Sequence, residues 1–267
     1  MTNALSERVV DLPDELRPWI TRVGVLRLDT VPTEPFVHLP DADTKVVVRV
    51  EGDGRRSVLV VGPRVRATYH AGKPIVSCVE VRLAPGTTLP LLGVPAVDLV
   101  GRAAFLGDLP GKVPRQLAAE LLGLDPDPES TTTRLAEILP ARLSAVADPA
   151  RTELVRAGVD AMSIRTGRLP GPVPDVAREL AVSERQLRNL FAEGVGLSPK
   201  HYARINRVRA VLAHATELSW AQLAAVTGYY DQSHMTSDFR ALMGVPPRSY
   251  FTGHLPEAMP CRVIRRG

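Results

Sequence analysis

The hydrophobic positions of this chain follow one pattern before about residue 110 and another after it. In the first part, short valine-rich segments alternate with Gly, Pro and Asp, which is typical of β-strands separated by turns. The expected strands are 22–28, 45–50, 57–61, 64–69 and 75–83, with Glu51-Gly-Asp-Gly54 as a candidate hairpin turn. Short strands at this spacing predict a small β-barrel or sandwich.

Beyond Pro110 the apolar residues recur at the three- and four-residue spacing of a helix. Helices are expected at about 113–124, 130–145 and 149–166. Antiparallel helices of this kind would suit the pairing of two subunits. Residues 167–174 are rich in Pro and Gly, so they predict a linker to a further domain.

The last third of the chain carries the same pattern twice. Two segments align without gaps at an offset of 48 residues, and the matched residues are Phe191 with Phe239, Gly196 with Gly244, Pro199 with Pro247, and Tyr202 with Tyr250. Two copies at so long an offset are unlike a stacked repeat array, so a tandem pair of units is the better interpretation. Each copy combines a short helix, a break and a second helix, which is the pattern of a helix-turn-helix.

In the first copy, Pro174 and Asp175 can begin a scaffold helix, and Ser183 can cap the helix that follows. Ser183 stands three residues before Gln186, the spacing of a capping box, in which a hydroxyl and an amide satisfy free backbone donors reciprocally. The apolar stripe of this second helix consists of Leu187, Leu190 and Phe191. Its polar residues are left free to meet DNA, so we name this helix the first reader.

The second copy begins with Ser219 and Gln222, another candidate capping box. Asp231 can then cap the second reader helix, whose expected buried residues are Met235 and Phe239. The polar residues of this reader are short enough to approach base edges. The second reader is less basic than the first.

Between the copies, Ser198-Pro199 predicts the start of a long helix, because Ser is a good N-cap and Pro suits the first helical position. Apolar residues recur at helical spacing from Tyr202 to Leu212. About 18 residues at about 1.5 Å each give roughly 27 Å. This length is of the order of the roughly 34 Å between successive major-groove openings on one face of B-DNA, so one monomer could read two adjacent grooves.

Residues from about 174 to 252 resemble the DNA-binding domain of the AraC family of bacterial transcription regulators. The residues that carry the resemblance are Ser183, Leu187, Phe191, Gly196, Ser198, Pro199, Tyr202, Arg207, Ala210, Ala224, Gly228, Tyr229, Phe239, Gly244 and Pro247. The resemblance implies that exposed residues in the first two turns of each reader contact base edges. In this chain these residues are Arg185, Gln186, Arg188 and Asn189, and Gln232, Ser233, His234 and Ser237.

Two positions of the second reader depart from the family pattern. His234-Met235 stands in place of the family's Ser-Tyr/His-Phe run, and Asp238 stands where an arginine often precedes the final Phe. An acidic residue there could repel a phosphate or accept a hydrogen bond from cytosine N4. This reader could therefore read bases or chiefly grip the DNA backbone.

The basic charge lies in the part of the chain that contains the readers. Residues 1–166 hold 20 Lys and Arg against 21 Asp and Glu, whereas residues 167–267 hold 13 against 8. Phosphate contacts set the affinity for DNA and its salt dependence without reading the sequence. The candidates for such contacts are Ser183, Lys200, Arg204, Arg207, Arg209, Arg240 and Arg248, with an ordinary solvated side chain as the alternative for each.

Three N-terminal segments are similar to a domain that often precedes this DNA-binding module: Leu16-Arg-Pro-Trp19, Val81-Arg-Leu-Ala-Pro-Gly86 and Leu91-Leu-Gly-Val-Pro95. The similarity implies a fold related to the cupin-like sensor domain of AraC regulators. An interior lined by residues such as Val25, Val47, Val60 and Cys78 would favour a small, partly apolar effector, with ordinary core packing as the alternative.

Membrane and disulfide-rich classes fit the sequence poorly. The apolar runs are far too short to span a bilayer, and the N-terminus lacks a basic start followed by an apolar stretch. Cys78 and Cys261 are well apart in sequence, which indicates neither a disulfide framework nor a zinc site. We therefore expect a soluble cytoplasmic protein without membrane association.

An enzyme is the remote alternative, in the form of an AraC-type module fused to a metal-dependent cupin enzyme. His38 and His70 lack the His-x-His spacing of such a metal site, and Asp41 with Asp43 is expected to form a turn. A fused DNA-alkylation repair domain would need a cysteine cluster, but the N-terminal half has one cysteine. We therefore assign no catalytic residues, no metal site and no cofactor.

The sequence predicts an α+β protein with a cupin-like β-barrel or sandwich, helices after it, and an all-α tandem helix-turn-helix domain with a long linker helix. The predicted divisions are 1–110 (sensor), 111–166 (helical, dimerising or connecting), 167–174 (linker), 175–255 (DNA binding) and 256–267 (basic tail). The expected function is sequence-specific transcription regulation. The expected partners are double-stranded DNA, a small-molecule effector, a second subunit, and RNA polymerase if the protein is an activator. The alternative is a regulator whose N-terminal domain only dimerises or binds a protein partner.

Overall fold

The strands of the N-terminal half form two sheets. The structure is a computed structural model that describes residues 8–27, 35–71, 75–124, 127–144, 148–165 and 168–260. Within these residues the larger sheet has six antiparallel strands in the order β1-β2-β7-β4-β5-β8, and the smaller has three in the order β3-β6-β9. The strands are β1 (Arg8–Val10), β2 (Ile20–Arg27), β3 (Pro35–His38), β4 (Lys45–Glu51), β5 (Arg56–Val61), β6 (Thr68–Ala71), β7 (Ile75–Leu83), β8 (Ala103–Phe105) and β9 (Met259–Pro260).

Helices make up most of the remaining described chain. Those of the N-terminal half are α1 (Thr88–Leu92), the 3-10 helix η2 (Ala96–Leu99), α2 (Lys112–Gly123) and α3 (Pro128–Ser144). The others are α4 (Pro149–Ala161), α5 (Val173–Glu179), α6 (Glu184–Gly194), α7 (Pro199–His214), α8 (Trp220–Val226), α9 (Gln232–Met243) and α10 (Pro247–Phe251). None of the helices in the described ranges is both long and apolar enough to cross a membrane.

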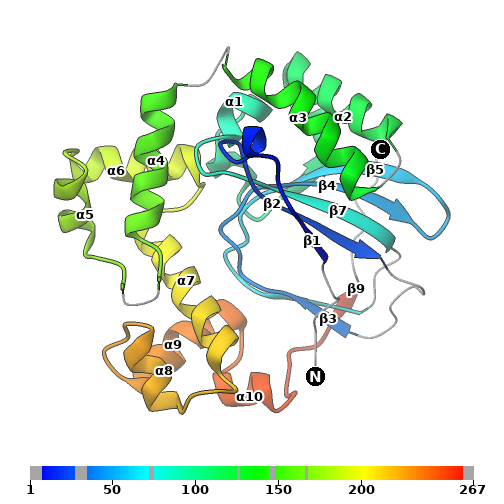
Figure 1. Cartoon of the computed structure of the whole chain (residues 1–267). Coiled ribbons are helices and arrows are strands. Elements are labelled where there is room, and N and C mark those ends of the chain that lie inside the picture. Colours follow the sequence, from blue (N-terminus) through cyan, green and yellow to red (C-terminus); the bar gives the residue numbers. More distant parts are fainter. Residues whose placement is uncertain are drawn as a thin grey trace.

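One face of the six-stranded sheet is apolar because valine occupies alternate positions of its strands. Val46 lies opposite Val60 on one neighbouring strand and opposite Val81 on the other, and all three are buried. Helices α1, α2 and α3 cover this face (Figure 1), and their leucines, such as Leu117 and Leu139, join the valines in one core. A cavity between these helices and the sheet measures only about 10 Å³.

The opposite face of the sheet is largely polar. Lys45, paired in register with Arg82, lies on this face, and so do Val47 and Cys78. Val25 and Val60 instead lie on the helix-covered face. The prediction that Val25, Val47, Val60 and Cys78 line one apolar interior is therefore wrong, because neighbouring residues of a strand point to opposite faces.

Most of the predicted strands and helices are confirmed, with shifts of a few residues at their ends. Glu51–Gly54 does form the hairpin turn between β4 and β5, with a hydrogen bond from the Gly54 amide to the Glu51 carbonyl of 2.9 Å. The predicted strand 64–69 begins only at Thr68, because Arg64 makes an isolated bridge with Asp41 instead. Predictions that concern Gly167, Cys261 and the tail from 261 to 267 lie outside the described residues.

Helix α4 packs on the helical C-terminal half. Val155 of α4 shares a core with Leu187 and Phe191 of α6, and a Cβ built on Gly158 would lie 3.0 Å from the Phe191 ring. This close approach makes α4 a support of the first reader. The architecture is thus a β-sheet region followed by helices and a helical C-terminal domain, which confirms the predicted α+β class (Figure 1).

Candidate DNA-binding surface

The first helix-turn-helix consists of α5 and the first reader, α6. The Ser183 hydroxyl accepts a hydrogen bond of 3.1 Å from the Gln186 amide, which is one of the two hydrogen bonds of the capping box that the sequence predicted. Leu187, Leu190 and Phe191 are buried, as the spacing indicated. The turn before α6 places Ala181 at a φ of 53°, a left-handed conformation that is costly for a residue with a Cβ.

The second helix-turn-helix consists of α8 and the second reader, α9. Ser219 and Gln222 form both halves of a capping box, and the Asp231 carboxylate accepts a hydrogen bond of 2.7 Å from the His234 amide. The turn has one residue more than in the first copy, because α8 starts 47 residues after α5 whereas α9 starts 48 after α6. The longer turn presents Tyr230 with 93% of its surface exposed.

Helix α7 joins the two units (Figure 1). It begins at the Ser198 cap, whose hydroxyl accepts a hydrogen bond of 3.2 Å from the His201 amide. Its 16 residues correspond to a length of about 24 Å. One side of α7, with residues such as Ile205 and Val208, is fully buried against both units. A rigid helix therefore sets the separation of the two readers.

The eight residues predicted to read bases are all exposed on the first turns of α6 and α9: Arg185, Gln186, Arg188, Asn189, Gln232, Ser233, His234 and Ser237. Arg188 forms an ion pair with Glu184, one turn earlier on the same helix. The His234 ring packs edge-on against Tyr229, with 5.2 Å between the ring centroids. Exposed intrahelical ion pairs are weak, so Arg188 can exchange Glu184 for another acceptor at small cost.

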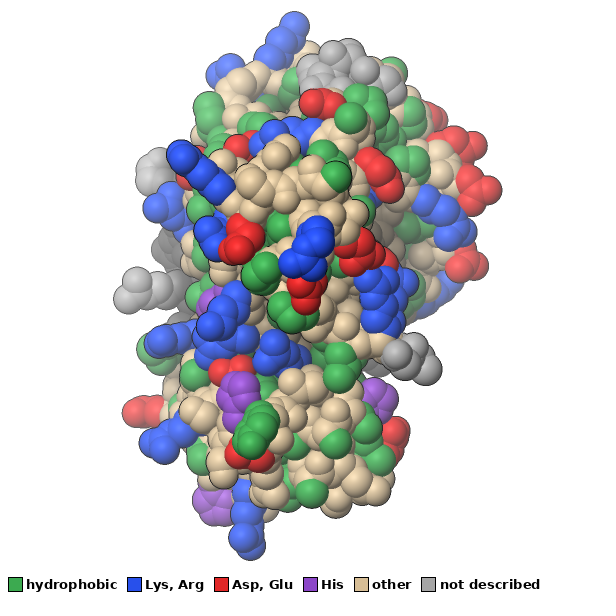
Figure 2. All heavy atoms as spheres, turned by 90° about the vertical axis from the view of Figure 1, so that its left-hand side faces the viewer, with side chains coloured by type: hydrophobic (Ala, Val, Ile, Leu, Met, Phe, Trp, Pro, Cys, Tyr) green, Lys and Arg blue, Asp and Glu red, His purple; other side chains and the backbone are tan. Residues whose placement is uncertain are grey.

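The predicted phosphate contacts fall into three groups. Lys200, Arg240 and Arg248 are exposed, and no acidic partner occurs for them among the described residues. Ser183 is exposed but already caps α6. The linker arginines have protein partners: Arg207 stacks over Tyr229 at 5.4 Å from the ring centroid, and Arg204 and Arg209 form the contacts described below. Figure 2 looks at the left-hand side of Figure 1 and shows basic side chains gathered at mid-height of this face, with acidic ones among them.

Arg204 pairs with Asp238, the acidic residue that departs from the family pattern. The guanidinium nitrogens lie 2.9 and 3.0 Å from Asp238 Oδ1, and the two side chains are 29% and 12% exposed. This contact joins α7 to α9. Asp238 is turned into the protein, so it stabilises the second reader against the linker helix and does not face a phosphate.

The N-terminal half holds the C-terminal ends of both readers. The Gly86 amide donates a hydrogen bond of 3.0 Å to the Gly194 carbonyl at the end of α6. The Ala67 amide donates one of 2.7 Å to the Leu242 carbonyl of α9, and the Tyr69 hydroxyl donates one of 2.7 Å to the neighbouring Met243 carbonyl. Because helix C-termini have free carbonyls, these donors dock each reader at the end away from its base-reading residues.

A third contact attaches the linker helix to the same domain. Arg209 of α7 donates a hydrogen bond of 3.1 Å to the Pro40 carbonyl and lies 3.8 Å from the Asp41 carboxylate. Asp41 also accepts from Lys45 at 2.6 Å. Burial acts to raise the pKa of Asp41, but the charges of Lys45, Arg209 and Arg82 outweigh it and hold that pKa below its usual range. We name the three attachments, at the ends of α6 and α9 and in the middle of α7, the three-point contact.

The structure also shows what surrounds the acidic residues and histidines for which the sequence left a metal-binding or catalytic role as the alternative. Arg82 pairs with Asp43 at 2.9 Å and Glu80 at 3.0 Å, as expected for a structural ion pair. His38 and His70 come together on β3 and β6, with ring centroids 5.3 Å apart, although they are distant in sequence. In the part of the chain that the structure describes, no cluster of three or more His, Cys, Asp or Glu side chains could hold a metal ion.

Comparisons with known proteins show what the C-terminal half is similar to. Residues 176–253 match a family described as helix-turn-helix domain. The transcriptional regulator GbdR of Pseudomonas aeruginosa is 32% identical over 81 residues, which cover 30% of this chain and 22% of GbdR, so the chain spans about a fifth of the length of that relative.

Several solved structures are also similar, including these two. One is ToxT of Vibrio cholerae, at 11% identity and a TM-score of 0.40 over 86% of this chain and 96% of ToxT. The other is an AraC-type regulator of Chromobacterium violaceum, at 27% identity and a TM-score of 0.33 over 42% of this chain and all of that one. The domain match and the GbdR match bear out the resemblance seen in the sequence: residues 176–253 form an AraC-type helix-turn-helix domain.

Proposed function

We propose that this protein regulates transcription by binding a specific DNA sequence, with α6 and α9 entering successive major grooves. Arg185, Gln186, Arg188 and Asn189 would read the bases of one groove, and Gln232, Ser233, His234 and Ser237 those of the next. Lys200, Arg240 and Arg248 would contact phosphates. A bacterial regulator that binds DNA would act in the cytoplasm, where the DNA lies.

The observation that supports this proposal best is the pair of capped reader helices on a single rigid support. Each reader exposes its polar first turns while its apolar side is buried in one core shared with α7. A separation set by about 24 Å of helix is compatible with the roughly 34 Å repeat of B-DNA once the readers extend beyond the helix ends. Tyr230, which the sequence reasoning missed, adds a solvent-exposed hydroxyl next to the start of α9.

A selection experiment tests the proposal directly. The full-length protein would be incubated with a pool of randomised duplex DNA, and the bound fraction sequenced over several rounds. We expect a motif with two blocks separated by about one helical turn. Recovery of a single block would restrict base reading to one helix, and the same selection with Arg185→Ala and Ser233→Ala variants would identify which. Enrichment of no motif would contradict sequence-specific binding.

We further propose that the N-terminal domain adjusts the readers through the three-point contact in response to a small-molecule effector. The cavity of about 10 Å³ under α2 and α3 is smaller than any effector, so binding on that face would require the core to open. The opposite face of the sheet carries polar and charged groups, with Lys45, Arg49 and Arg82 among them, each paired with an acidic side chain of the same domain. These groups suit a polar effector better than the partly apolar one expected from the sequence.

A thermal-shift screen of the full-length protein against polar metabolites tests the effector proposal. A ligand that binds only the folded state raises the unfolding midpoint, and the rise grows with the logarithm of the ratio of its concentration to its dissociation constant. We expect at least one compound that raises the midpoint and changes the affinity for the selected DNA. A compound that stabilises the protein but leaves its affinity for DNA unchanged would bind without regulating, which would contradict the effector proposal for that compound.

A second possibility is that the N-terminal domain serves, through α2 and α3, for dimerisation or for contact with a protein such as RNA polymerase. Their apolar sides are buried against the sheet, so a partner would meet their polar outer sides. Sedimentation of the full-length protein with and without its selected DNA would show whether two copies associate. A monomer in both conditions would exclude the dimer.

A further inference from the structure

The N-terminal half places an arginine beside the second reader. The backbone of Ala67 is attached to the end of α9 by the hydrogen bond to the Leu242 carbonyl, and the preceding residue, Arg66, is exposed. Arg66, Ser237 and Arg240 border one open hollow of about 440 Å³, together with Ala67, Ala241, Leu242 and Gly244. The hollow therefore joins a predicted base-reading residue and a predicted phosphate contact to a residue outside the helix-turn-helix domain.

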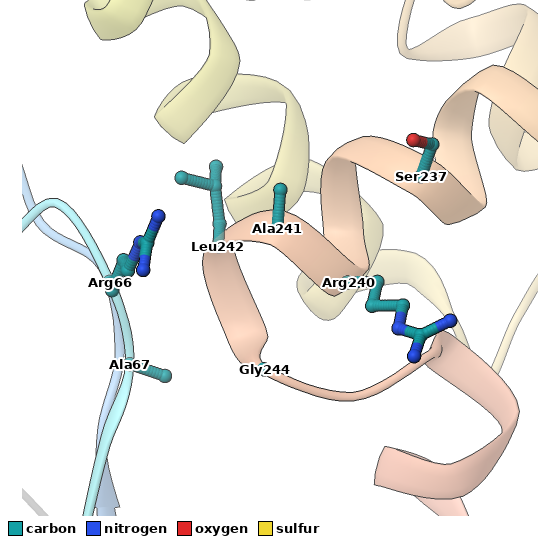
Figure 3. A pocket seen from close by; sticks show the side chains of 7 residues that line it. All are labelled: Arg66, Ala67, Ser237, Arg240, Ala241, Leu242 and Gly244. Atoms are coloured by element: carbon teal, nitrogen blue, oxygen red, sulfur yellow. The ribbon is translucent and has the colours of Figure 1, made fainter.

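The two arginines lie on different sides of the reader. Figure 3 shows Arg66 rising from the N-terminal segment alongside the last turn of α9, whereas Arg240 leaves the helix on the other side. A helix in the major groove is flanked by the phosphate backbones of both strands, because the groove is only about 12 Å wide. Cations on two sides of α9 match this arrangement.

The charges around the hollow are not neutralised within the protein. Over the described ranges, Arg66 and Arg240 have no ion pair or side-chain hydrogen bond. The carboxylate of the same helix, Asp238, is already occupied by Arg204. An excess of positive charge in an open hollow favours an anion.

We propose that Arg66 of the N-terminal half contacts the DNA phosphate backbone beside α9, so that the DNA-binding surface extends beyond the helix-turn-helix domain. This inference rests on the proposed DNA-binding function. It gives the N-terminal half a direct part in DNA affinity, in addition to its attachment to the readers. A phosphate contact adds affinity for any sequence, so Arg66 would strengthen binding without changing which site is preferred.

The test measures the salt dependence of DNA binding by the full-length protein. Affinities for the selected site and for a random duplex would be determined at several chloride concentrations for the wild type, Arg66→Ala, Arg66→Lys and Arg240→Ala. The slope of log affinity against log salt is negative, and loss of one phosphate contact reduces its magnitude by about 0.9. We expect this decrease for Arg66→Ala on both duplexes, little change for Arg66→Lys, and a decrease for Arg240→Ala.

Arg115→Ala is the matched control. Arg115 is an exposed arginine of the same half of the protein, and it donates to the carbonyl of Gly111, the N-cap of its own helix α2, away from the readers. Its slope should equal that of the wild type. The unfolding midpoint of Arg66→Ala should also be unchanged, because the attachment to α9 uses the backbone of Ala67 and not the Arg66 side chain.

A wild-type slope for Arg66→Ala, with a reduced slope for Arg240→Ala, would overturn the inference and leave the proposed function intact. Absence of any preference of the wild type for its selected site would instead overturn the proposed function itself. Inorganic phosphate at matched ionic strength distinguishes a free anion from DNA. If it stabilises the wild type but not Arg66→Ala while the DNA slopes agree, the hollow is a free-anion site and Arg66 does not contact DNA.

Discussion

Arg185 and Lys200 are both exposed cations of the helix-turn-helix domain, but they are placed for different tasks. Arg185 lies in the first turn of α6, whereas Lys200 lies in the first turn of α7. Arg185→Ala should reduce discrimination between the selected site and its single-base variants by about 1–3 kcal/mol, the worth of a bidentate guanine contact. Lys200→Ala should weaken binding to all sequences alike. Titration of both variants against a panel of duplexes measures the difference, and unchanged discrimination by Arg185→Ala would remove it from the base readers.

The Arg204–Asp238 pair should be a stability determinant, since it joins α7 to α9 in a mostly buried place. Removing one partner leaves a charge without compensation, so Asp238→Asn and Arg204→Ala should each lower the free energy of unfolding by about 1–3 kcal/mol. The double variant should cost less than the sum of the two. Denaturant unfolding gives these values. Arg248→Ala, an exposed arginine, is the control and should change stability by less than about 0.5 kcal/mol.

His201 should make stability depend on pH near neutrality. Burial, followed by the charge of Arg204, lowers the pKa of this imidazole below its ordinary value. The unfolded chain therefore binds the proton more readily than the folded one, so the contribution to stability is present above the unfolded pKa of about 6.5 and is lost as the pH falls through the folded pKa. Unfolding midpoints at mildly alkaline and mildly acidic pH should differ less for His201→Gln than for the wild type. Equal differences would show that other groups cause the pH dependence.

At the scale of single elements, the sequence predicted what is locally encoded. Helix caps such as Ser198 and Asp231, and the alternation of valine in β4, act between neighbouring residues and were visible in the pattern. Strands β3 and β9 were missed because they are short and their pairing partner, β6, is distant in sequence. The extra turn residue that exposes Tyr230 could have been found, because the buried residues of α5 and α8 align at an offset one residue shorter than those of the readers.

In the candidate DNA-binding surface, too, locally encoded features could be predicted and contacts between distant segments could not. All eight residues assigned to the bases are exposed, since a helical stripe fixes which side is buried. The partners of Arg204 and Arg209 could not be read from the sequence, because they come from segments 34 and 169 residues away. The grouping of Val25 with Val47 was wrong, because it treated strand residues as a set without their alternation.

The junction between α6 and α7 should tolerate no side chain at Gly196. Its φ is 86°, and a Cβ there would lie 2.7 Å from the Ala96 carbonyl oxygen of η2. Gly196→Ala should therefore both strain the backbone, by about 1–2 kcal/mol, and push η2 away from the first reader. Gly244→Ala is the matched control, because Gly244 has a similar φ of 78° but its Cβ would meet only Pro256, at 3.8 Å. We expect a lower unfolding midpoint for Gly196→Ala than for Gly244→Ala, and equal midpoints would show that the contact with η2 adds nothing.

At the scale of the whole molecule, the three-point contact couples DNA to the N-terminal half. If DNA shifts either reader, the amides of Ala67 and Gly86, which donate to the ends of α9 and α6, must respond. We expect their hydrogen-exchange rates to change when the selected duplex binds, because coupling between two sites is reciprocal. The amide of Val48, within the six-stranded sheet, serves as reference. Unchanged exchange at Ala67 and Gly86 would mean that the readers bind without moving against the domain.

The position of β9 in the smaller sheet bears on how the chain is made. Its residue Met259 pairs with His70 in a parallel arrangement, although the whole helix-turn-helix domain lies between them in the sequence. During synthesis on the ribosome, this sheet can reach its full width only after that domain has emerged. The smaller sheet is therefore complete only when both halves are present, and an N-terminal fragment expressed alone would expose the edge of β6, an unpaired strand edge of the kind that promotes aggregation.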